Sequence, residues 1–124
     1  MTRLHHVNVV VPPGATEEVA PFYELLGLTR MAKPTEGVAA SGAWFELPGG
    51  AHQVHVSERE GVRNADQHFA LVVDDLDALV QALAAAGHPV ADGRPLLGAR
   101  RANTADPVGN KVELIESVGA FAAG

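Results

Sequence analysis

The pattern of apolar and polar positions predicts two elements at the start of the chain. Residues 4–11 are a short β-branched run, typical of a strand, and the prolines and glycine of residues 12–14 end it. Over residues 19–26, apolar side chains recur at i, i+3, i+4 and i+7, which indicates a helix with one buried face. Gly27 follows as a typical C-terminal stop signal. We therefore expect a strand followed by a short helix.

Two signals disagree on where this helix begins. Thr16 is a typical N-cap residue, and acidic residues follow it in what would be the first turn. Pro21 would remove one hydrogen bond from the interior of a helix that starts there. Either Thr16 caps the helix, or the ordered helix begins later, nearer Ala20.

Runs of strand-forming residues come next, separated by proline and glycine turns. Two or three antiparallel strands are expected from the runs at residues 28–31, 43–47 and 53–57. Residues 68–73 predict a further strand, which opens the second half of the chain.

In that half, apolar residues again recur with the spacing of a helix that buries one face. Asp74 or Asp75 is expected to cap this helix, and Gly87 to end it. A loop-rich stretch at residues 97–103 then leads to a last strand at residues 111–116. The apolar side chains of the two helices that we expect in the core are Val19, Phe22, Leu26, Leu76, Leu79, Val80 and Leu83.

Both halves of the chain follow one order of strand, helix, glycine and several strands. The glycines that end the two helices, Gly27 and Gly87, lie 60 residues apart. This offset predicts one domain over residues 1–124 with an internal repeat of residues 1–60 and 61–124. The fold class is α+β: two paired βαβββ modules form a curled mixed sheet around a cleft, with the helices on the outer faces.

Composition narrows the classes of function and partner. With 47% apolar and 19% charged residues, the chain suits one soluble globular domain, and its net charge of −6 disfavours nucleic acid as a partner. The absence of cysteine excludes disulfides, thiolate metal sites and cysteine nucleophiles. No secretory signal or transmembrane segment is found, so we expect a cytoplasmic protein without a membrane partner. Exposed edge strands favour a homodimer.

Alternation of side chains along the strands predicts four polar residues that face the cleft. His6 and His68 lie opposite the bulky apolar faces of their strands, and His55 and Glu113 are placed in the same way in later strands. His6 and His68 are 62 residues apart, and His55 and Glu113 are 58 apart, both close to the repeat offset. The four residues therefore come from equivalent positions of two repeats.

Three imidazoles and one carboxylate suit a divalent first-row ion, that is Fe, Mn, Ni, Co or Zn, with ligand distances of about 2.0–2.2 Å. We therefore predict a metal site. The remaining histidines are interpreted as structural or surface residues: His5, His52 and His88. The neighbouring residues Arg100 and Arg101 could hold an anionic substrate group. At most one of them points inward, because adjacent residues of a strand face opposite ways.

Several short motifs together resemble the vicinal oxygen chelate superfamily, which includes glyoxalase I, extradiol dioxygenases, fosfomycin resistance enzymes, methylmalonyl-CoA epimerase and bleomycin-binding proteins. The resemblance covers nearly the whole chain. Its motifs are Leu4-His5-His6-Val7, Phe22-Tyr23, Leu26-Gly27-Leu28, Trp44-Phe45, His68-Phe69-Ala70, Asp74-Asp75-Leu76 and Asp106-Pro107-Val108-Gly109-Asn110-Lys111-Val112-Glu113.

This resemblance implies metal ligands at His6, His68 and Glu113, and His55 matches the place where glyoxalase-like members have a glutamate. It also implies that the metal chelates vicinal oxygens of a small substrate, with Glu113 as the catalytic base. A lyase or isomerase of glyoxalase type and a dioxygenase with two histidines and one carboxylate on iron are both consistent with these residues.

Two other classes of function remain open. One is a non-catalytic protein of the bleomycin-sequestering type, whose pocket would use Trp44 or Phe45, only one of which can line the cleft. The net charge of −6 suits a cationic drug. The other is a scaffold domain without a ligand.

Overall fold

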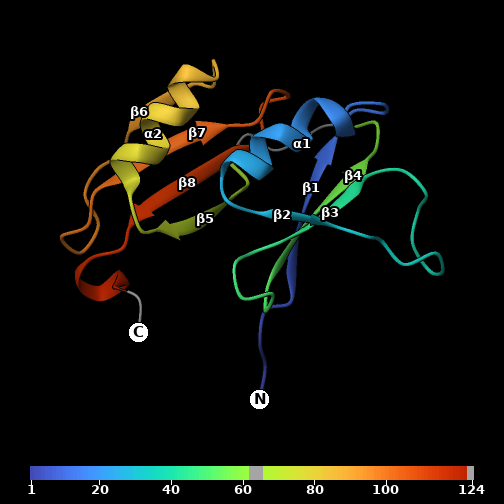
Figure 1. The fold of residues 1–124 in the computed structure, drawn as a ribbon, viewed down its shortest axis with the longest axis horizontal. Helices are drawn as coiled ribbons and strands as arrows, with labels where there is room; N and C mark the ends of the chain where they lie inside the picture. The colour runs from blue at the N-terminus through green and yellow to red at the C-terminus, as the bar shows by residue number, and fades with distance from the viewer. Residues whose placement is uncertain (62–65, 123–124) are drawn as a thin grey trace. The chain divides into compact units, whose positions relative to one another are not determined.

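The computed structural model describes residues 1–61 and 66–122 (Figure 1). The chain divides into two compact units, residues Met1–Arg63 and Asn64–Gly124. Within the described residues, each unit contains one α-helix and one four-stranded sheet. Among the described residues, no helix is long and apolar enough to cross a bilayer.

The first unit contains β1 (His6–Val11), α1 (Thr16–Leu25), β2 (Thr29–Met31), β3 (Ala43–Glu46) and β4 (Gln53–Glu58). Its sheet has the strand order β1-β4-β3-β2. The pair β1 and β4 is parallel, and the other pairs are antiparallel. Helix α1 packs on this sheet and contacts β2, β3 and β4.

The second unit repeats this arrangement, and a short 3₁₀ helix follows it. Its sheet has the order β5-β8-β7-β6, with β5 parallel to β8 and the other pairs antiparallel. The α+β class with two βαβββ modules is therefore confirmed. The elements are β5 (His68–Val73), α2 (Leu76–Ala85), β6 (Val90–Asp92), β7 (Arg101–Ala105), β8 (Lys111–Glu116) and η1 (Gly119–Phe121).

The sheets bury the faces that the alternation predicted. In β1 the side chains of His6 and Asn8 are exposed, whereas Val11 on the opposite face is fully buried. In β5 His68 is exposed and Leu71 is buried. Most of the predicted helical core is buried, but Leu79 and Val80 of α2 are only half-buried, because they lie at the side of the helix stripe rather than at its centre.

Helix α1 begins at Thr16, which corrects both expectations for its start. The N-cap position belongs to Ala15, whose side chain cannot accept a hydrogen bond, and Pro21 is accommodated inside the helix. The cap comes instead from β4, because the Glu58 carboxylate accepts from the backbone N–H of Gly14 at 2.8 Å and from the Thr16 hydroxyl at 2.6 Å. These hydrogen bonds, the Thr16 hydroxyl first, lower the pKa of Glu58.

The second unit confirms one predicted boundary and corrects another. The Asp75 side chain accepts a hydrogen bond from the backbone N–H of Ala78 at 3.0 Å and thus caps α2. Residues 97–103 were expected to be a loop, but β7 already begins at Arg101. Alanine and asparagine are weak strand formers, so the pairing with β8 on one side and β6 on the other defines this strand.

Candidate metal site and adjoining pocket

In the first unit, the parallel pairing of β1 and β4 places His6 beside His55. His6 lies opposite Gln53 in the register, and Asn8 lies opposite His55. The imidazole rings of His6 and His55 stack with centroids 3.9 Å apart and an angle of 15° between their planes. The structure thus brings together the two histidines that the sequence predicted in this half.

The other face of the His55 ring is covered by Trp44. The two residues lie directly opposite each other in the antiparallel pair of β3 and β4. Their rings stack almost in parallel, with centroids 4.0 Å apart and an angle of 4°. His55 is therefore held between Trp44 and His6, a contact that strand alternation alone did not predict.

The nitrogen atoms of His55 are also constrained. Its Nε2 lies 2.7 Å from Oε1 of Gln53, two residues earlier on the same face of β4. Burial, followed by the nearby charges of His6, His5 and Lys33, lowers the pKa of His55 to about 4. The ring is therefore neutral near pH 7, as a metal ligand must be, but Nε2 would have to leave Gln53 to bind an ion.

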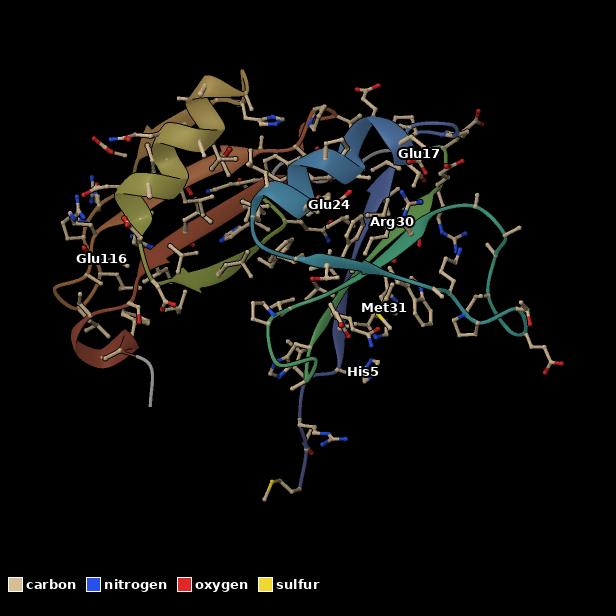
Figure 2. All side chains as sticks on the ribbon, in the orientation of Figure 1. His5, Glu17, Glu24, Arg30, Met31 and Glu116 are labelled. Carbon is tan, nitrogen blue, oxygen red and sulfur yellow. The ribbon has the colours of Figure 1, made fainter. Side chains whose placement is uncertain are left out.

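His5, labelled in Figure 2, contacts this cluster through its neighbour His6, in agreement with its interpretation as a structural residue. Its Nδ1 lies 3.0 Å from Nδ1 of His6. His5 precedes β1, so the alternation of the strand does not apply to it. With Nδ1 of His6 engaged by His5, Nε2 is the nitrogen of His6 that is left for an ion.

In the second unit, the parallel pairing of β5 and β8 places His68 beside Glu113. The pair has the same offset as His6 and His55, because Glu113 lies opposite Ala70, two residues after His68. Nε2 of His68 lies 3.4 Å from Oε2 of Glu113. Nδ1 of His68 lies 2.9 Å from the carbonyl oxygen of Asp66, to which it can donate.

Arg101 holds the other oxygen of the Glu113 carboxylate. Its Nη1 donates to Oε1 at 2.5 Å, and its Nε donates to the carbonyl oxygen of Arg94 at 2.7 Å. The side chain of Glu113 is mostly buried, with 12% of its surface exposed. One carboxylate oxygen of Glu113 therefore accepts from Arg101, and the other faces His68.

Arg100 lies on the opposite face of the sheet from Arg101, as the alternation predicted. It pairs with Asp77 of α2 and with Glu116, at 2.9 and 2.8 Å. Only Arg101 therefore shares the face of Glu113.

The donor pair of the second unit fits a metal ion. Two donors at about 2.0–2.2 Å from one ion are separated by roughly 3.0–3.5 Å, which matches the distance between His68 and Glu113. No group of three or more His, Asp or Glu side chains able to hold an ion is found within residues 1–61 and 66–122. The structure thus provides two donor pairs, one in each unit.

A pocket of about 280 Å³ opens beside His55 in the first unit. Its walls include Trp44 and the segment of residues 37–39. Phe45, the neighbour of Trp44, is fully buried on the other face.

The family model of the Glyoxalase/Bleomycin resistance protein/Dioxygenase superfamily matches residues 3–114. The chain belongs to this superfamily. No curated protein matches its sequence. Among solved structures, this superfamily member is similar to a protein of Bacillus anthracis assigned to the glyoxalase family, with 30% identity and a TM-score of 0.82 over 94% of this chain and 95% of the other.

Two further structures share the fold at lower identity. TnmS3, an antibiotic binding protein from Streptomyces sp. CB03234, is 22% identical over 94% of this chain and 96% of its own, with a TM-score of 0.73. Lactoylglutathione lyase from Agrobacterium tumefaciens is 19% identical over 94% of both chains, with a TM-score of 0.69. The same fold therefore serves proteins named for binding and proteins named for catalysis, and the residues of the site must decide between them.

Proposed function

We propose that this superfamily member is a metal-dependent enzyme that acts on a small oxygen-rich substrate. His6, His68 and Glu113 would hold one divalent ion, Fe, Mn, Ni, Co or Zn, with His55 as a fourth donor. The observation that carries the proposal is the pair formed by His68 and Glu113, whose facing atoms are 3.4 Å apart while the second nitrogen of His68 is engaged by a carbonyl oxygen. Such an outer hydrogen bond is typical of metal-binding histidines.

When bound, the ion would act as a Lewis acid that chelates vicinal oxygens of the substrate. Glu113 is the candidate general base. Its Oε1 is held by Arg101, which fixes the orientation of the carboxylate. Oε2, the oxygen that faces His68, would therefore have to leave the ion when substrate binds in order to accept a proton. A lyase or isomerase and a dioxygenase both remain within this proposal.

A screen of the metal-loaded protein tests the proposal, with hemithioacetals, catechols, and fosfomycin with thiols as substrates. Turnover of one class is expected, and Glu113→Gln should abolish it, because the amide keeps the size of the side chain but cannot act as a base. Arg100→Gln is the matched control, since Arg100 lies on the other face of the sheet. Equal turnover in wild-type and Glu113→Gln protein would contradict the role of Glu113.

The second candidate function is non-catalytic binding of a bleomycin-like drug. It is favoured by the internal pairing of the polar groups, because Arg101 donates to Glu113 and Gln53 lies within hydrogen-bond distance of Nε2 of His55. Stoichiometric binding of bleomycin to chelator-treated protein, without turnover of any substrate, would support this candidate over the enzyme.

We also propose a homodimer. The strand orders leave β1 and β2 at the edges of one sheet and β5 and β6 at the edges of the other, and such edges favour pairing between chains. Sedimentation at micromolar concentration tests this, and a species of only 12.9 kDa would contradict it.

A further inference from the structure

The pocket beside His55 has a local charge opposite to that of the whole chain. Three charged residues line it: Lys33, Glu58 and Arg59. The Glu58 carboxylate is engaged by the N–H of Gly14 and the hydroxyl of Thr16, so its oxygens are already directed to the start of α1. The lining therefore holds two cations against one carboxylate, an excess of positive charge, although the chain has a net charge of −6.

The polar side chains of the pocket mainly offer donors. Nζ of Lys33 donates to the carbonyl oxygens of Ala39, at 2.5 Å, and of Ser41, and an ammonium group has a third N–H. The Ser57 hydroxyl donates to Oδ1 of Asn8 at 2.7 Å, which leaves the Asn8 amide N–H groups for another acceptor. A ligand rich in oxygen acceptors matches these groups, whereas an ammonium ligand does not.

The apolar part of the pocket adds a second requirement. Trp44, Val38 and Val56 line it together with the donors. A ligand that fills the pocket therefore needs an apolar body beside its anionic group.

The wall that closes the pocket is fixed before a ligand binds. Lys33 holds the wall formed by residues 37–42, because its Nζ donates to the carbonyl oxygens of Ala39 and Ser41. Gly42 lies so close to β4 that a Cβ there would be 2.1 Å from the carbonyl oxygen of Val56. A preformed pocket binds without the entropic cost of ordering its walls.

We propose that this pocket binds a small organic anion, with its carboxylate on Lys33 and Arg59 and its apolar body against Trp44. The anion would be the substrate of the proposed enzyme, and in this respect the inference rests on the proposed function. The binding itself requires only the first unit and no metal, so the two proposals can fail separately.

Trp44 is the only tryptophan of the chain, so its fluorescence reports on this pocket. Chelator-treated protein is titrated with benzoate and with benzylamine, which carry opposite charges on the same ring. Benzoate should give a saturable change, and benzylamine should bind at least tenfold more weakly. Lys33→Gln and Arg59→Gln should each weaken benzoate binding by about tenfold, because each removes a charge-assisted hydrogen bond.

Arg3→Gln removes an exposed cation that does not line the pocket and is the matched control, with unchanged binding expected. Lys33→Gln also removes the hydrogen bonds of Lys33 to the pocket wall. Arg59→Gln therefore keeps the test valid if Lys33→Gln disturbs that wall. Equal or tighter binding of benzylamine, binding of neither probe, or benzoate binding unaffected by both variants would overturn the inference. Benzoate binding in a protein that holds no metal would leave this inference standing while the proposed enzyme fails.

Discussion

Nδ1 of His5 and Nδ1 of His6 lie 3.0 Å apart, and the two imidazole rings are almost perpendicular, at 89°. One of the two nitrogens must carry the proton that joins them. If His6 donates, its Nε2 has no proton and can bind an ion. His5 would then have the same role for His6 as the Asp66 carbonyl oxygen has for His68.

This relationship predicts the tautomer of His6. Nitrogen-15 NMR of the metal-free protein at pH 8 should show His6 protonated at Nδ1 and not at Nε2. His5→Ala should lose this preference and weaken metal binding by about tenfold or more, the range seen for outer partners of metal ligands. His52→Ala, at an exposed histidine of the same unit, should change neither property. A proton on Nε2 of His6 in the wild-type protein would refute the role of His5.

The contact of Glu58 with the start of α1 predicts a pH-dependent stability. Because the folded state lowers the pKa of Glu58, its contribution is complete above the unfolded-state pKa, about 4.3, and is lost as the pH falls through the folded value. Thermal denaturation of Glu58→Gln should therefore show a lower midpoint than wild type at pH 7, and the difference should shrink below about pH 4. Glu18→Gln, at an exposed glutamate of α1, is the control. A difference that does not change with pH would contradict this account.

Substitutions at Gly37 and Gly42 allow the cost of backbone strain to be compared with the cost of a steric clash. Gly37 and Gly42 both have positive φ, 76° and 85°, but only Gly42 has an atom near the position of an added Cβ, the Val56 carbonyl oxygen at 2.1 Å. Gly37→Ala should cost about 1–2 kcal/mol, the cost of left-handed backbone, and Gly42→Ala clearly more. Urea denaturation of both variants measures the difference. Equal free energies of unfolding would contradict the close packing of Gly42.

The sequence predicted most of the elements and the faces of their strands, because both are local properties. The alternation around His6 and His68 placed these side chains on the exposed face, and Asp75 was correctly placed at the start of α2. The start of α1 was wrong because its capping group, Glu58, is 42 residues away from Thr16 in the chain.

Contacts between strands were the part that the sequence did not reveal. The stack of Trp44 on His55 depends on the register of β3 and β4, which no local pattern encodes. The contact of His5 with His6 was missed because His5 lies just outside β1. The engagement of Glu113 by Arg101 likewise needs the pairing of β7 with β8.

The metal content of the purified protein tests the proposed function most directly. Elemental analysis should find about one divalent first-row ion per chain, lost in His6→Ala, His68→Ala and Glu113→Ala and reduced in His55→Ala. His88→Ala, at a histidine outside both donor pairs, should keep the full content. Wild-type protein that holds no ion after incubation with each of these metals, or that keeps its ion in all four variants, would contradict the account.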